Sequence, residues 1–255
     1  MAAISYDSTA ILRNFARRQH ITFPLLADPE SRIIRRFGVL NPHAEGFTKG
    51  RAYPGFFVLT RHGVVREKFF ESADQLRYTA NNLVARLFPE LTEEVERAVA
   101  APHLQVSLAQ SDAAAVPGSR LTLLAHINLP AQVHVYAPGV EHYIPLQLVL
   151  DSAPGYELRP PVYPKARWLS LPAIHETVPV FEGHFTVAQD VVVALENNVV
   201  GPGDDKTLLV RGHLSYQACD QHECFVPDRV PVSWQVKLLP LDRERAPEAV
   251  QHRAR

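Results

Sequence analysis

Two stretches in the last third of the chain alternate apolar and polar residues. Residues 207–216 and 230–238 place an apolar side chain at nearly every second position, which is typical of β-strands with one buried face. The segment between them holds the only cysteines in the sequence, Cys219 and Cys224. Two thiols at the ends of a short turn can reach disulfide distance without moving the rest of a fold. The pattern therefore predicts two strands joined by a segment in which the cysteines can bond.

The same period-two pattern continues through most of residues 103–242. Pro-Gly pairs punctuate it, which marks turns between short strands. The pattern predicts an antiparallel β-sandwich, with further strands at residues 104–108, 121–127, 133–136, 146–150, 185–187 and 191–195. Residues 159–172 are rich in proline and predict a long loop, which is either a lid over the cysteines or a plain connection. Residues 243–255 are polar, and we expect a frayed tail.

Residues 1–88 have a different pattern, in which helical spacing alternates with short apolar runs. Ser8 and Asp28 are placed to cap helices, with Pro29 in the first turn of the second helix. The pattern predicts an α/β domain with a closing helix, its elements being strands at 2–6, 23–26, 55–60 and 64–69 and a helix at 73–87. Residues 89–102 predict a helical linker to the sandwich.

Composition narrows the function classes. An apolar fraction of 46% and a charged fraction of 21% are those of an ordinary globular protein. With 26 basic and 27 acidic residues, there is no electrostatic case for binding nucleic acid or an anionic membrane. No apolar run approaches the roughly eighteen residues that span a bilayer. The first residues lack the features of a signal peptide, so the chain as written reads as cytoplasmic. We expect no cofactor.

Three interpretations of the cysteine pair remain open. A disulfide here closes a short ring, so the chain-entropy estimate gives it only about 2 kcal/mol of stabilisation. Such a bond contributes little to folding, and we therefore favour a redox-active pair. A structural disulfide is the second interpretation. The third is a zinc site formed with His213 and His222, although the spacing matches none of the common zinc motifs.

The segment 216–219, Tyr-Gln-Ala-Cys, followed by 224–227, Cys-Phe-Val-Pro, resembles the N-terminal (alpha) domains of the thiol:disulfide interchange protein DsbD. Residues 134–138 and 178–183 fit the same family. The resemblance covers more than half of the chain and implies an immunoglobulin-like sandwich whose paired cysteines exchange disulfides with partner proteins. If the start of the chain is truncated, the resemblance also implies a periplasmic or other extracytoplasmic location, so the compartment stays open. In that family an aromatic cap loop shields the pair. The candidates for cap or site-adjacent residues are Tyr136, Tyr163, Trp168, Tyr216 and Phe225.

The order of elements in residues 1–88, together with segments 5–8, 21–26 and 53–58, resembles the peroxiredoxin-like (AhpC/TSA, redoxin) branch of the thioredoxin fold. The resemblance implies a cis bond between Tyr53 and Pro54, with Pro54 beside a reactive thiol. Residues 1–100 contain no cysteine, so Pro54 marks a vestigial site. We favour a fragment or a misplaced start over a degenerate scaffold kept for binding.

Three functions follow for this α/β plus all-β chain. The first is thiol–disulfide exchange through Cys219 and Cys224 with thiol or disulfide partner proteins. The second is a peroxiredoxin-type peroxidase whose cysteine lies upstream of Met1, and the third is a non-catalytic sandwich with a structural bond. Asp220 adjoins Cys219 and disfavours its thiolate. For exchange we therefore expect Cys224 to attack partners, as the resemblance also implies, and Cys219 to resolve the mixed disulfide.

Overall fold

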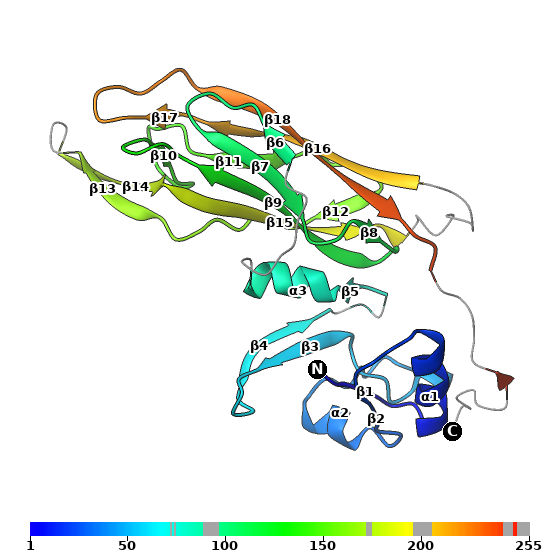
Figure 1. The fold of residues 1–255 in the computed structure, drawn as a ribbon. Helices are drawn as coiled ribbons and strands as arrows, with labels where there is room; N and C mark the ends of the chain where they lie inside the picture. The colour runs from blue at the N-terminus through cyan, green and yellow to red at the C-terminus, as the bar shows by residue number, and fades with distance from the viewer. Residues whose placement is uncertain are drawn as a thin grey trace. The chain divides into compact units, whose positions relative to one another are not determined.

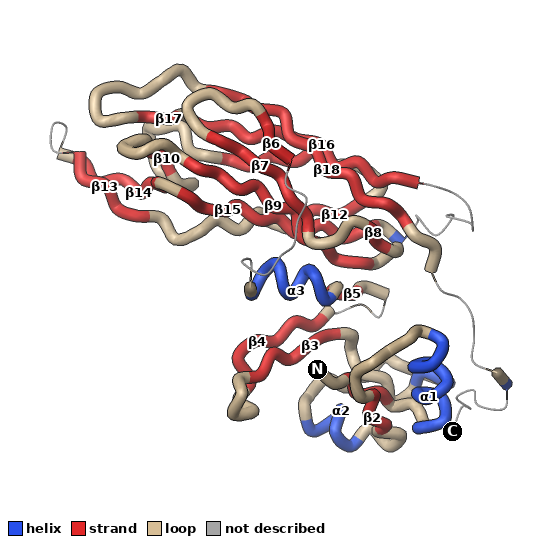
Figure 2. Tube along the Cα trace, in the orientation of Figure 1, coloured by secondary structure: helices blue, strands red, loops and turns tan. Residues whose placement is uncertain are grey.

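The computed structural model describes residues 1–71, 73, 75–88, 97–171, 175–195, 206–241 and 247–248. These residues form two compact units, one of residues 1–77 together with 247–248 and one of residues 78–241 (Figure 1). The first is a partial α/β module and the second is built almost entirely of antiparallel strands (Figure 2). The expected class, α/β followed by an immunoglobulin-like sandwich, is confirmed. No helix among the described residues is long and apolar enough to cross a membrane.

The α/β unit consists of two separate pairs of strands with two short helices and a 3₁₀ turn. Strands β1 and β2 pair in parallel, and β3 and β4 form an antiparallel hairpin. Among the described residues these pairs are not joined into one sheet. The elements are β1 (Ala3–Ser5), α1 (Thr9–Arg18), β2 (Leu25–Ala27), α2 (Arg32–Arg36), η1 (Gly46–Thr48), β3 (Gly55–Leu59) and β4 (Val65–Phe70).

Side chains fix where both helices of this unit begin. The Ser8 hydroxyl accepts a hydrogen bond from the Ile11 amide, as expected for an N-cap. The second helix begins later than its sequence predicts, at Arg32. The buried Asp28 carboxylate reaches over Pro29 to accept hydrogen bonds from the amides of residues 32, 33 and 34. One aspartate thus satisfies several of the amides that a helix start leaves unpaired.

The bond between Tyr53 and Pro54 is trans, so the prediction of a cis bond was wrong. Backbone hydrogen bonds hold both residues of this peptide bond: the Tyr53 amide donates to the Val39 carbonyl, and the Pro54 carbonyl accepts from the Glu71 amide at 3.0 Å. Trans is also the lower-energy form of an X–Pro bond, by about 0.5–1 kcal/mol. The geometry at Pro54 therefore gives no support to a vestigial thiol site.

Three sheets make up the second unit. Their strand orders are β12-β15-β9-β7-β6, β11-β16-β18-β8 and β13-β14-β10-β17. Apolar residues from all three meet in one core, where Leu121, Val187 and Val210 are fully buried. The strands are β6 (Arg97–Val99), β7 (Gln105–Gln110), β8 (Ala114–Ala115), β9 (Ser119–Asn128), β10 (His134–Tyr136), β11 (Gln147–Leu150), β12 (Tyr156–Leu158), β13 (Arg167–Leu171), β14 (Glu176–Glu182), β15 (His184–Val193), β16 (Lys206–Tyr216), β17 (Ala218–Cys219) and β18 (Asp228–Leu238).

The closing helix expected over residues 73–87 is shorter and packs on the sandwich. Strand β5 (Arg77–Tyr78) precedes it, and α3 (Ala80–Leu87) begins after Thr79, whose hydroxyl accepts from the Asn82 amide. The buried Asn82 amide group donates to the Thr122 hydroxyl at 2.7 Å and to Asp190 at 3.3 Å. Arg86 adds an ion pair to Asp190 at 2.8 Å. These polar contacts fasten α3 to strands β9 and β15.

Two further segments differ from the sequence prediction. Residues 97–99, expected in a helical linker, form strand β6, because their backbone pairs with the edge of β7. Residues 167–171, expected in a proline-rich loop, form β13 and pair with β14. Prolines surround this stretch but none lies inside it, so its amides remain available for the ladder. Residues 100–102 of the expected linker are not helical either. Residues 89–96 lie outside the described residues, as does most of the tail.

Candidate functional site

The two cysteines form a disulfide across a tight hairpin. Their sulfurs are 2.02 Å apart and their Cα atoms 4.0 Å apart. Hydrogen bonds flank the pair on both sides, from the Asp220 amide to the Glu223 carbonyl and from the Phe225 amide to the Ala218 carbonyl, each at 2.9 Å. Cys219 and Cys224 thus occupy a non-hydrogen-bonded pair of antiparallel backbone, the position where facing side chains come closest. Local hairpin geometry therefore brings the thiols together.

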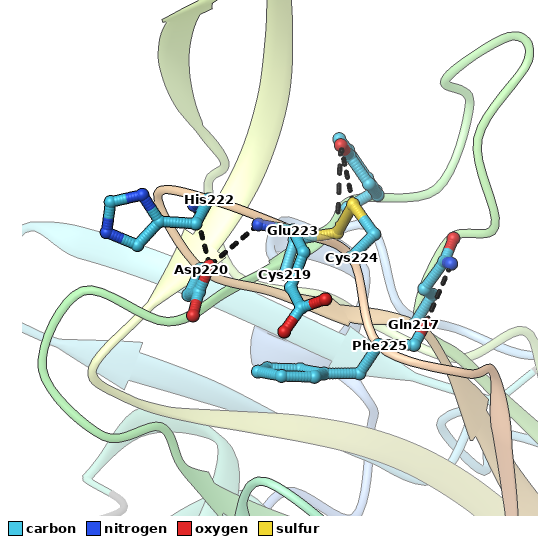
Figure 3. Close-up of a disulfide and its surroundings, with 8 residues drawn as sticks. Gln217, Cys219, Asp220, His222, Glu223, Cys224 and Phe225 are labelled. Atoms are coloured by element: carbon cyan, nitrogen blue, oxygen red, sulfur yellow. Dashed lines mark hydrogen bonds between the residues drawn. A yellow bond between two sulfur atoms is a disulfide. The ribbon is translucent and has the colours of Figure 1, made fainter.

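Asp220 holds the turn between the cysteines. Its carboxylate accepts hydrogen bonds from the His222 amide at 2.7 Å and the Glu223 amide at 2.9 Å (Figure 3). These two bonds lower the pKa of Asp220 below its ordinary value. The carboxylate is thus a fixed negative charge beside Cys219, and it also defines the shape of the turn.

The two cysteines differ sharply in exposure. Cys219 lies in β17 at the edge of a sheet and is 1% exposed. Cys224 lies on the return side of the hairpin and is exposed, as are its neighbours His222, Glu223 and Val226. A molecule arriving from solvent therefore meets Cys224 first. The sequence could not show this asymmetry, since both cysteines have polar neighbours.

Tyr136 lies against both sulfur atoms. Its hydroxyl is 3.8 Å from Cys224 Sγ and 3.9 Å from Cys219 Sγ. A bonded sulfur carries no proton, so only the hydroxyl can donate in these contacts. Burial, and then the charge of Glu176, raises the pKa of Tyr136, which keeps the hydroxyl protonated near neutral pH. Of the aromatic candidates, Tyr136 is the one with a direct contact to the disulfide.

Apolar residues cover the buried cysteine on the face of the sheet that Tyr136 occupies. Cys219 forms a small cluster with Tyr136, Val178 and Val180, and the residues packed against this cluster are Val140, Tyr143, Leu169 and Leu171. The ring of Tyr143 stacks on Tyr136 with centroids 4.3 Å apart. The Tyr143 hydroxyl donates to Glu176, which raises the pKa of Tyr143 to about 12. This cover excludes water from Cys219.

The other aromatic candidates do not cover the pair. Trp168 alternates with Leu169 along β13, so its side chain projects from the opposite face, and it is 68% exposed. Tyr216 is fully buried in the main core, where its hydroxyl donates to the Pro102 carbonyl. Tyr163 accepts from the Leu148 amide. Phe225 follows Cys224 in the chain, and its ring stacks on His103 at a centroid distance of 3.9 Å.

His134 was missed by the sequence analysis. It is directly opposite Cys219 in the register between β10 and β17, and it is 6% exposed. The sequence did offer one signal that His134 belongs to the site. His134 lies two positions before Tyr136, and residues two apart on a strand project from the same face. Tyr143, Leu169 and Leu171 were also missed, since nothing local relates them to the cysteines.

The zinc alternative finds no support in this geometry. Cys219 and Cys224 bond to each other, and His213 lies on β16 with its Nδ1 atom 3.0 Å from an Arg229 nitrogen. Within the described ranges, no group of three or more potential ligands gathers around one point.

Comparisons with known proteins return both expected resemblances. Residues 1–68 match the model of the AhpC/TSA family. One similar solved structure is the N-terminal periplasmic domain of ScsB from Proteus mirabilis, at 10% identity and a TM-score of 0.34, covering 58% of this chain and 50% of that one. Another is the DsbD N-terminal domain of Neisseria meningitidis in the reduced form, at 14% identity and a TM-score of 0.31. The match covers 60% of this chain and 98% of that one. The chain thus spans half of the ScsB domain. No curated protein sequence is significantly similar to it.

Proposed function

We propose that the chain is a thiol–disulfide exchange protein in which Cys219 and Cys224 cycle between disulfide and dithiol. The observation that carries the proposal is the exposure of the pair. Cys224 is exposed, so a partner can approach it, whereas Cys219 is buried behind Tyr136. Exchange requires that an attacking thiolate can reach one sulfur, and burial of the other sulfur favours attack at the exposed one.

In this proposal Cys224 is the residue that meets partners. In the reduced protein the Cys224 thiolate attacks a sulfur of the partner's disulfide, forming a Cys224–partner bond and releasing the partner's other sulfur as a thiolate. Cys219 then attacks Cys224 Sγ, re-forms the internal bond and releases the second partner thiol. The partner disulfide gains two electrons and the Cys219–Cys224 pair loses two. The reverse sequence reduces the pair.

The electrostatic surroundings favour this assignment. Asp220 stays ionised because two backbone amides bind its carboxylate, and its charge opposes a thiolate on the adjacent Cys219. Cys224 is exposed, so water can solvate its thiolate, whereas Cys219 is buried and its charged form is not solvated.

Two serine variants test the proposal. Full-length Cys219→Ser and Cys224→Ser are reduced and incubated with glutathione disulfide, and the mass of each is followed over time. We expect Cys219→Ser to gain one glutathione rapidly and Cys224→Ser to gain little. Equal labelling of the two variants would contradict the assignment.

The reduction potential of the wild-type pair separates exchange from a structural bond. We expect a value well above about −300 mV, below which structural disulfides lie. A lower potential, together with failure of both variants to form a mixed disulfide, would leave a non-catalytic sandwich with a structural bond.

The match of residues 1–68 to the AhpC/TSA family favours one second candidate, a peroxiredoxin-type reaction. That chemistry needs a peroxidatic cysteine, and residues 1–100 contain none. We therefore expect this chain alone to show no peroxide consumption beyond that of free thiols. Saturable turnover of hydrogen peroxide that survives Cys219→Ser and Cys224→Ser would contradict this expectation.

A further inference from the structure

A buried histidine lies directly opposite the buried cysteine. His134 and Cys219 are paired across strands β10 and β17. Paired residues on neighbouring strands project from the same face with Cβ atoms about 5 Å apart. The ring of Tyr136, which touches both sulfurs, meets the imidazole edge to face at a centroid distance of 5.5 Å. Histidine, tyrosine and disulfide therefore form one contiguous group.

The imidazole has an unused nitrogen. His134 is 6% exposed, and its Nε2 atom is buried with no hydrogen-bond partner among the described residues. A buried polar atom without a partner costs free energy, and such atoms in folded proteins call for an explanation. In the disulfide, Cys219 carries no proton that Nε2 could accept, whereas the thiol of reduced Cys219 does.

The charged groups around His134 leave it neutral. Glu182 is its register partner on β14 and is itself paired with Arg167 at 2.7 Å. Asp220 acts on it from the hairpin turn. Both carboxylates favour the protonated ring, but burial outweighs them and lowers the pKa of His134 below its ordinary value. Near neutral pH the ring is thus in its base form.

Cys219 needs a base in order to react. Its thiol is buried behind Tyr136 and beside the charge of Asp220, and both burial and a neighbouring negative charge disfavour the thiolate. The thiolate is the form that attacks a disulfide. Exposed Cys224 can lose its proton to water, whereas buried Cys219 cannot do so readily.

We propose that His134 is the proton acceptor for Cys219 in the resolving step, an inference that rests on the exchange function proposed above. In the mixed disulfide, the Cys219 proton moves to His134 Nε2 as Cys219 Sγ attacks Cys224 Sγ. The Cys219–Cys224 bond forms, the Cys224–partner bond breaks, and the partner leaves as a thiolate. The imidazolium then returns its proton to solvent or to the departing thiolate.

Rapid mixing with an aromatic disulfide that releases coloured nitrothiobenzoate separates the two steps. The reduced full-length protein should release one equivalent when Cys224 attacks and a second when Cys219 resolves. We expect His134→Gln to leave the first phase unchanged and to slow the second about a hundredfold at neutral pH, the low end for loss of a general base. The second phase of the variant should then keep rising with pH, whereas the wild-type rate should level off. His184→Gln, on an exposed position of β15, is the matched control.

A second measurement needs no variant. If His134 and Cys219 share a proton, linkage requires the pKa of His134 to differ between the disulfide and dithiol forms, as followed by NMR of its ring. An unchanged second phase in His134→Gln, or an unchanged pKa of His134 on reduction, overturns the inference and leaves the exchange function standing. Absence of the first phase in wild-type protein overturns both.

Discussion

The two units of the chain bury their apolar residues to very different extents. In the sandwich, strands from three sheets enclose a continuous core whose members include fully buried Leu121 and Val210. Among the described residues of the α/β unit, the buried apolar side chains are those of Leu12 and Ile34 alone. Leu26, which lies on strand β2 of this unit, is 47% exposed. Two-stranded pairs cannot enclose a core by themselves. The comparison indicates that the sandwich provides a rigid scaffold for the cysteines, whereas the α/β unit depends on additional packing.

The largest expected effect is on independent folding. A fragment of residues 78–241 should unfold cooperatively, because the complete core lies within it, while residues 1–77 alone should show no cooperative transition. Thermal denaturation followed by circular dichroism distinguishes them. Cooperative unfolding of residues 1–77 would show that both units fold independently and would contradict the prediction.

The same experiment tests where the domain begins. The sequence places the start of the sandwich at residue 103, but α3 and β6 pack on it from upstream. A fragment of residues 103–241 should therefore be clearly less stable than one of residues 78–241. Equal stability would favour the boundary expected from the sequence.

Single core substitutions provide the next largest effect. Leu121→Ala removes a fully buried side chain and should lower the free energy of unfolding by about 2–5 kcal/mol. Leu26→Ala, on a strand of the α/β unit, should cost within about 0.5 kcal/mol, as substitutions at exposed positions do. Urea denaturation of the full-length variants measures both. Similar losses at the two positions would show that the α/β unit is packed as tightly as the sandwich.

Reduction of the disulfide should have a smaller effect. The bond closes a short ring, so its loss should cost the sandwich about 2 kcal/mol and leave it folded. The α/β unit contains no cysteine, and any transition assigned to it should not respond to reductant, which makes it the internal control. Global unfolding of the sandwich on reduction would instead show that the bond is a structural staple.

The smallest effect concerns the turn held by Asp220. The pKa of Asp220 is lower in the folded protein than in the unfolded chain. The carboxylate therefore stabilises the fold at pH values above its pKa in the unfolded chain, and this stabilisation is lost as the pH falls through its pKa in the folded protein. The amide signals of His222 and Glu223 should shift in that acidic range, while amides of the α/β unit should not follow the same titration. Asp220→Asn keeps an acceptor oxygen and should retain more of the turn than Asp220→Ala. A turn unaffected by either change would show that the strands alone define it.

Local patterns were sufficient to predict most elements. Alternation identified the long strands β16 and β18, and two cysteines at the ends of one short turn predicted the disulfide between them. The helix cap at Ser8 was also predicted, because a cap depends on neighbours within one turn of the chain. The prediction failed at residues 97–99, where the helical pattern was overridden by backbone pairing with the edge of β7, the next strand along the chain.

The surroundings of the cysteines depended on the tertiary structure. Tyr136 reaches both sulfurs from a strand more than eighty positions upstream, and His134 faces Cys219 because of a register that no local pattern specifies. Burial of Cys219 and exposure of Cys224 follow from which side of the hairpin completes the sheet. The sequence by itself determined that two thiols meet on a hairpin, since hairpin geometry is local. Only the tertiary structure decided which thiol a partner can reach and which side chains touch the other, because burial is set by strands far apart in the chain.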